Sequence, residues 1–209
     1  MTNSLSENTR SIYQEMMSHP ALFSHAKPNR IALLSTEASG VEIEILKHPT
    51  VIELTHITPK TPSSGDTRLR HYSGSVAQWL EQAAEETFDI IIAENLEKKN
   101  LAKLYTLLDT SGILLQCGES PFAIQAIKEM QQALHHAGFT DAQTLNFPQP
   151  VFPTGWKTAW MAKKEGILRR VREKDIFNKS FTTHYYNLDV HKAALALPEF
   201  MRVELHTEE

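Results

Sequence analysis

The stretch RIALLSTEASGVEIEILKH, residues 30–48, decides how the rest of the chain is expected to fold. It opens with four consecutive apolar residues after Arg30, continues through a small polar turn, and ends in a segment with apolar residues at helical spacing. This pattern predicts a buried strand that leads into a helix. In a parallel α/β sheet, a nucleotide-like cofactor usually lies at this first turn, because backbone N–H groups and the helix N-terminus face the ligand there.

The turn itself is poor in glycine, which limits how closely a ligand could approach its backbone. Close approach requires a residue without a Cβ atom, and residues 35–39 (STEAS) precede the single glycine of the turn, Gly40. The position suits a nucleotide-like cofactor, while the residues do not. The sequence leaves open whether the chain is an active enzyme or keeps the fold of an enzyme without the activity.

The composition is that of one ordinary globular domain. The chain has 209 residues, of which 41% are apolar and 22% charged, enough for a core without help from a cofactor or disulfides. A formal net charge of −4 gives no basic surface, so nucleic acid and anionic membranes are not expected as partners. The polar N-terminus and the lack of a long apolar run predict a cytoplasmic protein. The single cysteine, Cys117, can form no internal disulfide and is predicted to be a core thiol.

Strand and helix patterns alternate along the chain, which predicts an α/β fold with a mostly parallel sheet and helices on both faces. After a disordered tail at residues 1–11, a helix at 12–19 is expected to stop at Pro20. Strands are expected at residues 31–34, 48–57, 68–72, 88–93, 113–116, 140–147 and 157–162. Further helices are expected at residues 41–46, 76–84, 101–108, 120–137 and from 187 onward.

The helix expected at residues 120–137 has the clearest end signals. Ser120 is predicted to be its N-cap, Pro121 its first helical residue and Gly138 the residue just past its end. The preceding Ser111 and Gly112 are expected to form a turn into the strand at 113–116.

The histidines and tryptophans could in principle bind a metal or stack on a ligand, but the sequence favours solvent-exposed or core positions for them. The ten histidines include no pair at i, i+4 with a third ligand nearby, so no metal site is predicted. His135 and His136 are adjacent on a helix and are predicted to face solvent. Trp79, Trp156 and Trp160 stand in apolar contexts and are predicted to lie in the core.

Several stretches occur in an order that is shared with a known family. They are IYQEMMSHPALF (12–23), RIALL…EILKHP (30–49), FDIII (88–92), PVFPTGW (150–156) and HYYNLDVHKAALALP (184–198). They resemble the polyamine aminopropyltransferases, the spermidine synthase family, and the last is similar to the family's YYNPEIHRAAFALP. The resemblance runs over residues 12–209, which are expected to form one spermidine synthase-like domain.

The resemblance implies both a fold and an activity. The fold is a Rossmann-like, seven-stranded sheet of the S-adenosylmethionine-dependent methyltransferase type, with the last strand antiparallel. In active members, an aminopropyl group passes from decarboxylated S-adenosylmethionine to putrescine. The resemblance also implies a homodimer, and the family's N-terminal β domain is expected to be lacking here. No tightly bound cofactor is expected, and decarboxylated S-adenosylmethionine would be a co-substrate if the protein is active.

Departures from the family fall on the donor side of the site. The family's loop GGGDGG corresponds to residues 35–40, so the acid that faces the aminopropyl ammonium becomes Ala38. Two more acids are missing, from the family's VEID at residues 58–60 and from its GDG at residues 74–76. Since each charge-assisted hydrogen bond contributes roughly 1.5–3 kcal/mol, these losses could weaken donor binding by orders of magnitude. Glu37, Gly40 and Ser75 are the residues left to contact the donor.

The acceptor side keeps more of the family's chemistry. The family's DSTD corresponds to Glu94, Asn95, Leu96 and Glu97, which retains both acids. Glu94 is the candidate general base on an ammonium, with Asn95 beside it and Glu97 holding a distal ammonium. An alternative is that residues 94–99 (ENLEKK) are only a solvated helix start.

Three further acceptor-side residues are assigned from the resemblance. The family's YHE corresponds to residues 13–15, so Tyr13 and Gln14 would place the amine. Its PTYPSG corresponds to residues 151–155, where Phe152 has lost the substrate-side hydroxyl.

Two hypotheses follow. The first is a non-catalytic relative with a degenerate donor site, a pseudoenzyme that dimerises or binds another small polyamine or nucleoside. The second is an active aminopropyltransferase with altered substrates that uses Glu94 as general base.

Overall fold

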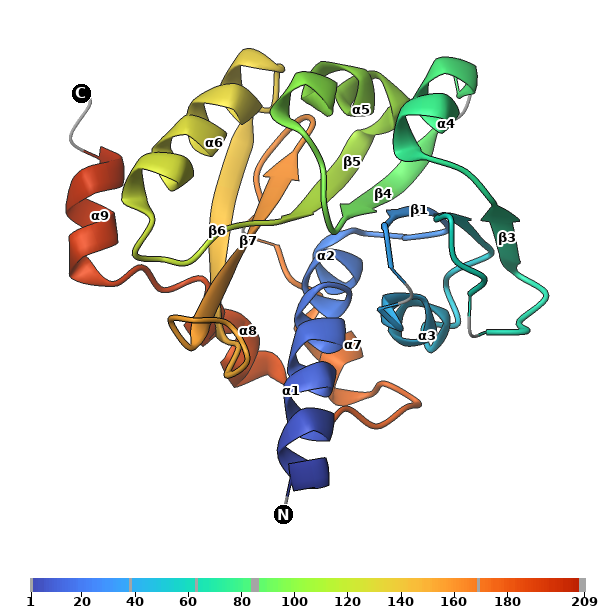
Figure 1. The fold of residues 1–209 in the computed structure, drawn as a ribbon, viewed down its shortest axis with the longest axis horizontal. Helices are drawn as coiled ribbons and strands as arrows, with labels where there is room; N and C mark the ends of the chain where they lie inside the picture. Colours follow the sequence, from blue (N-terminus) through green and yellow to red (C-terminus); the bar gives the residue numbers. More distant parts are fainter. Residues whose placement is uncertain (1, 38, 63, 84–86, 169, 207–209) are drawn as a thin grey trace.

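The computed structural model describes residues 2–37, 39–62, 64–83, 87–168 and 170–206 (Figure 1). Within them, seven strands form one sheet in the order β3-β2-β1-β4-β5-β7-β6. The strands are β1 (Arg30–Leu34), β2 (Glu53–Ile57), β3 (Leu69–Tyr72), β4 (Phe88–Ala93), β5 (Leu108–Cys117), β6 (Asp141–Pro148) and β7 (Trp156–Lys163). Neighbouring strands from β3 to β5 pair in parallel, and β7 is antiparallel to both β5 and β6. The seven-stranded α/β sheet and its antiparallel last strand were both predicted, and both are confirmed.

Helices cover both faces of this sheet (Figure 1). On one face lie α1 (Thr2–Met16), α2 (His19–Ser24), α3 (Val41–Leu46), α7 (Glu173–Phe177) and α8 (Leu188–Ala194). On the other lie α4 (Val76–Gln82), the 3₁₀ turn η1 (Lys98–Asn100), α5 (Leu101–Leu107), α6 (Ile124–His136) and α9 (Glu199–His206). Within the described part of the chain, no helix combines the length and the apolar character needed to cross a membrane.

The central strand β1 shows why the sheet is buried on both sides. Ile31 and Leu33 pack into the core beneath α1, α2 and α3, whereas Ala32 and Leu34 pack into the core beneath α4 and α5. All four side chains are fully buried. Because successive side chains of a strand point to opposite faces, an unbroken apolar run is the pattern of a strand that helices cover on both sides.

The N-terminal helices differ from the prediction. Residues predicted as a tail at 1–11 are helical from Thr2, and α1 ends at Met16. Once the later part of a helix is fixed by packing, each added residue gains a hydrogen bond without a new nucleation cost. Pro20 does not stop this helix; it lies in the first turn of α2, where the missing N–H would have no helical partner in any case.

Other element boundaries also differ. The strand predicted at 48–57 begins only at Glu53, because the Arg68 guanidinium binds the carbonyl oxygens of Leu46, His48 and Val51 and holds them in a turn. The turn predicted at residues 111–112 is part of β5, which starts at Leu108 with a register shift against β4.

The helix predicted from Ser120 begins at Ile124. The Ser120 hydroxyl pairs with the Thr154 hydroxyl over 2.9 Å and accepts the Phe122 N–H, so it caps no helix. At the other end the prediction is confirmed, since Gly138 follows α6 with a φ of +106°.

Of the three tryptophans, Trp79 and Trp160 lie in the core as predicted. The prediction was wrong for Trp156, whose side chain is 44% exposed at the start of β7.

The C-terminal segment is tied to α1 by a buried carboxylate. Glu15 is 2% exposed, and its two oxygens accept the backbone N–H groups of His184, Tyr185 and Tyr186 at 2.7, 2.8 and 2.7 Å. Asn187 then caps α8 by accepting the Val190 N–H. The Glu15 contact therefore fixes the position of α1 and of Tyr13, which lies on the same helix.

Candidate functional site

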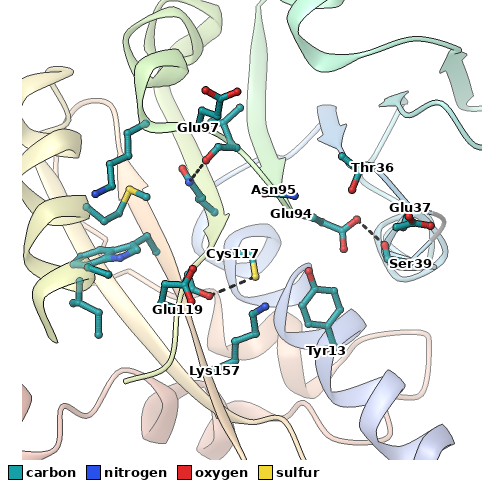
Figure 2. Close-up of a pocket in the computed structure, with 18 of the residues that line it drawn as sticks. Tyr13, Thr36, Glu37, Ser39, Glu94, Asn95, Glu97, Cys117, Glu119 and Lys157 are labelled. Carbon is teal, nitrogen blue, oxygen red and sulfur yellow. Dashed lines mark hydrogen bonds between the residues drawn. The ribbon is translucent and has the colours of Figure 1, made fainter. Parts of the chain in front are cut away.

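A cavity of about 910 Å³ opens beyond the carboxyl ends of β1, β4 and β5 (Figure 2). It lies where the strand order reverses between β1 and β4, the usual ligand position in an open α/β sheet. Its walls come from α1, the turn after β1, the segment after β4, the end of β5, α6 and β7. The polar and charged residues that line it are Tyr13, Thr36, Glu37, Ser39, Glu94, Asn95, Glu97, Lys98, Lys99, Gln116, Cys117, Glu119 and Lys157.

Glu94 is the carboxylate best placed for proton transfer in this cavity. It follows β4 directly, and the Ser39 hydroxyl donates a hydrogen bond to its Oε2 over 2.7 Å. Burial raises the pKa of Glu94 to about 7, although hydrogen bonds from Ser39 and Tyr13 act in the opposite direction. A carboxyl group with this pKa exchanges protons near neutral pH, as a general base or acid must.

Tyr13, Cys117 and Lys157 form the wall beside Glu94 (Figure 2). Burial raises the pKa of the Tyr13 hydroxyl and that of the Cys117 thiol, so both stay protonated at neutral pH. Cys117 was predicted to be a core thiol; it is half-buried and faces the cavity. A protonated thiol is a poor nucleophile, so the cavity contains an acid–base group rather than an activated cysteine.

A second cavity of about 410 Å³ adjoins the first and shares Thr36, Asn95, Leu96 and Glu97 with it. Its other lining residues are Ser35, Pro59, Ser73, Gly74, Ser75, Val76, Ala77 and Asn100. Among these described residues, Glu97 alone carries a carboxylate. Its side chain is 72% exposed and pairs with the Lys99 ammonium over 2.7 Å. The second cavity is therefore polar but almost without free negative charge.

Two predicted site residues, Gln14 and Gly40, shape the turn after β1 without lining either cavity. Gln14 Nε2 donates to the Ser39 carbonyl oxygen over 2.5 Å, and Gly40 immediately precedes α3, as its N-cap residue, with a φ of +81°. A Cβ atom at Gly40 would collide with the Gln14 amide. Neither Gln14 nor Gly40 is among the described residues that line the two cavities. Glycine is required here for packing against Gln14 and for the positive φ.

The remaining predicted residues divide between the cavities. Glu37 lines the larger one, Asn95 and Glu97 line both, and Ser75 lines the smaller one while it caps α4 by accepting the Gln78 N–H. Phe152 is not among the described lining residues; its ring lies 4.8 Å from the Lys157 ammonium. Ala38, the predicted site of the lost acid, lies outside the described residues.

Comparison with known proteins identifies the family. No family model matches the chain. The polyamine aminopropyltransferase of Halorhodospira halophila is 33% identical over 95% of this chain and 81% of that protein. The chain belongs to the polyamine aminopropyltransferase family. The enzyme of the same name from Thioalkalivibrio sulfidiphilus is also 33% identical, over 97% of this chain and 81% of its own length.

Solved structures of aminopropyltransferases share the fold. The spermidine synthase of Thermotoga maritima superposes with a TM-score of 0.83 and 21% identity over 94% of this chain and 75% of its own. A spermidine synthase in complex with the transition-state analogue AdoDATO gives the same score. The methyltransferase-like sheet implied by the sequence resemblance is thereby confirmed.

Sequence reasoning missed two residues of this aminopropyltransferase-type cavity, Ser39 and Lys157. Ser39 stands in the turn that the sequence had already marked, and its hydroxyl reaches Glu94 across 55 residues of sequence. Lys157 directly follows the motif PVFPTGW and is the second residue of β7. A charged residue next to a strongly matching motif was the available signal for Lys157.

Proposed function

We propose that this chain is a small-amine-binding member of the polyamine aminopropyltransferase family with a degenerate donor site. Transfer of an aminopropyl group from decarboxylated S-adenosylmethionine to putrescine is weak or absent. The proposal places the acceptor amine beside Glu94 and Tyr13 in the larger cavity.

One observation carries this proposal: the smaller cavity offers the donor no free carboxylate among its described residues. Decarboxylated S-adenosylmethionine carries positive charge on sulfur and on nitrogen. The end of β2 continues as Thr58, Pro59 and Lys60, and the α4 cap supplies Ser75 rather than an acid. Each missing charge-assisted hydrogen bond removes roughly 1.5–3 kcal/mol of binding free energy.

Titration calorimetry with decarboxylated S-adenosylmethionine tests this proposal. We expect a Kd of about 1 mM or weaker, since the loss of two anchors of roughly 1.5–3 kcal/mol each would weaken a Kd of about 10 μM by at least about 100-fold. A Kd in the low micromolar range would overturn the degenerate-site proposal.

A second candidate function is an active transferase with altered substrates. The pKa of Glu94, about 7, favours it, because a base must be free to accept a proton from an ammonium near neutral pH. Mass spectrometry of reactions that contain decarboxylated S-adenosylmethionine and a panel of amines would detect an aminopropylated product. In that case Glu94→Gln should abolish product formation, and an equally active variant would exclude Glu94 as the base.

We also propose that the protein acts in the cytoplasm as a homodimer. The family resemblance and the single cysteine support this, and so does exposed apolar surface. Phe122 and Phe200 stack on each other with ring centroids 5.7 Å apart, yet stay 61% and 42% exposed. Light scattering at micromolar concentration should give twice the chain mass of 23.7 kDa; a monomer would contradict the proposal.

A further inference from the structure

The wall of the larger cavity contains a lysine whose charge is not neutralised by a neighbouring acid. Three lysines line this cavity. Lys98 pairs with Glu129 over 2.6 Å, and Lys99 pairs with Glu97 over 2.7 Å. None of the described carboxylates lies within ion-pair distance of the Lys157 ammonium. Glu119, on the same wall, is also too far away to pair with it. Lys157 contacts the neutral Cys117 thiol instead, so among the described cavity lysines it is the one whose ammonium can still pair with a carboxylate of a ligand.

The position of Lys157 is fixed by its surroundings rather than by a counter-ion. It projects from the second residue of β7, and its ammonium lies 4.8 Å from the centroid of the Phe152 ring. A cation held over an aromatic face is attracted by the ring quadrupole. Figure 2 shows the side chain directed toward the space between Cys117 and Tyr13, inside the cavity. The ammonium is therefore presented to the cavity rather than to bulk solvent.

Lys157 and Glu94 lie on the same part of the cavity wall without forming an ion pair. They are close enough for the Lys157 charge to act on the Glu94 carboxyl, and Tyr13 contacts that carboxyl from α1. A ligand in this space meets both the Lys157 ammonium and the proton-accepting carboxyl of Glu94. A diamine would bring a second ammonium toward Lys157, where like charges repel each other.

We propose that the larger cavity selects a small amine that also carries a carboxylate, an ω-amino acid, with its carboxylate on Lys157 and its amine at Glu94. The inference rests on the proposed function of the cavity as a small-amine site and specifies the class of amine. Lys157 then acts as a specificity-determining binding residue. A carboxylate on the ligand completes the ion pair that the protein leaves unmade, which a diamine cannot do.

Calorimetric titration with four related probes tests this inference. The probes are 4-aminobutyrate, putrescine, butylamine and butyrate, each titrated into the wild-type protein. We expect 4-aminobutyrate to bind at least about tenfold more tightly than putrescine, which corresponds to about 1.4 kcal/mol. Butylamine and butyrate, each with one of the two groups, should bind more weakly than 4-aminobutyrate.

Variants of Lys157 separate its role from general electrostatics. Lys157→Gln should remove the preference for 4-aminobutyrate over putrescine, and Lys157→Arg should retain it. Lys98→Gln is the matched control, because Lys98 lines the same cavity but is already paired with Glu129, which lines neither cavity. It should leave the preference unchanged. Melting curves identify any variant that fails to fold, and the arginine variant then still tests the charge requirement.

The outcomes distinguish the inference from the proposed function. If putrescine and butylamine bind as tightly as 4-aminobutyrate, amine binding stands and the selectivity of Lys157 is overturned. If the preference persists in Lys157→Gln, Lys157 is not its cause and the inference fails. If none of the four probes binds, both the inference and the small-amine function fail.

Discussion

The side-chain amide of Gln14 occupies the space that a Cβ atom on Gly40 would need. Gln14 also donates to the Ser39 carbonyl oxygen, so α1 supports the turn after β1. Ser39 in turn donates to Glu94. A helix near the N-terminus thereby positions the acid–base group at the end of β4, through one glycine and one serine.

Gly40→Ala should destabilise the protein. A residue with a Cβ is strained at a φ of +81°, and this Cβ would also displace Gln14. We expect a loss of about 1–3 kcal/mol, which lowers the Tm of a chain of this size by about 2–12 °C. Thermal denaturation measures the effect. Gly65→Ala is the matched control, since its Cβ would meet nothing within 4 Å, and an equal loss in both variants would contradict the argument.

Glu15→Gln should weaken the attachment of the C-terminal segment. The carboxylate accepts three backbone N–H groups, whereas an amide offers one acceptor oxygen and places a donor NH₂ against another donor. Leaving a buried donor unpaired costs about 1–3 kcal/mol, which urea denaturation would detect. Glu7→Gln changes an exposed acid on the same helix and should have little effect. Similar stabilities for the two variants would disprove the buried role of Glu15.

The Glu94→Gln substitution should stabilise the protein increasingly as pH rises. The Glu94 pKa rises from an ordinary 4.5 in the unfolded chain to about 7 in the fold. Between these values the folded state holds more protons, so the contribution of Glu94 to stability falls as pH increases through this window. Glutamine does not titrate. The difference in unfolding free energy between variant and wild type should therefore grow by about 2 kcal/mol from pH 5 to pH 8. Denaturant titrations at both pH values measure it, and a difference independent of pH would refute the raised pKa.

Ser75→Asp should partly restore donor binding. Aspartate caps a helix as well as serine does, so α4 would keep its N-cap while the smaller cavity gains a carboxylate. One charge-assisted hydrogen bond of roughly 1.5–3 kcal/mol corresponds to about 10- to 100-fold tighter binding of decarboxylated S-adenosylmethionine. Ser75→Asn, a neutral residue that also caps, is the control. Equal affinities for the two variants in calorimetry would show that charge at this position does not limit binding.

Local sequence patterns could predict the sheet because each strand carries its own signal. FDIIIA was predicted as a strand at 88–93, and β4 has those bounds. Predictions failed where a distant group decides the local structure. Ser120 has the residue type of an N-cap, but Thr154 engages its hydroxyl from 34 positions away. Pro20 can either end a helix or begin one, and only the packing of α2 distinguishes these.

The candidate site could be predicted only in part for the same reason. Glu94 was identified because it directly follows a strong strand signal and a matching motif. Gln14 was assigned to the substrate from its motif position, whereas the structure turns its amide toward Ser39. Neither hydrophobic periodicity nor motif spacing marks Lys157 in the sequence. Its importance depends on the absence of a paired carboxylate in the folded structure, which the sequence does not reveal.

The contact between Glu15 and residues 184–186 also constrains when the protein can complete its fold. The partners are 169 to 171 positions apart in the chain, so α1 leaves the ribosome long before its carboxylate can be satisfied. Contacts between such distant residues form late, because loop closure must precede them. Until residues 184–186 are synthesised, the Glu15 carboxylate lacks its three backbone N–H partners, although α1 can already pack against α2 and α3. The contact that ties α1, and with it Tyr13 on the cavity wall, to residues 184–186 therefore forms only after all seven strands of the described sheet have been made.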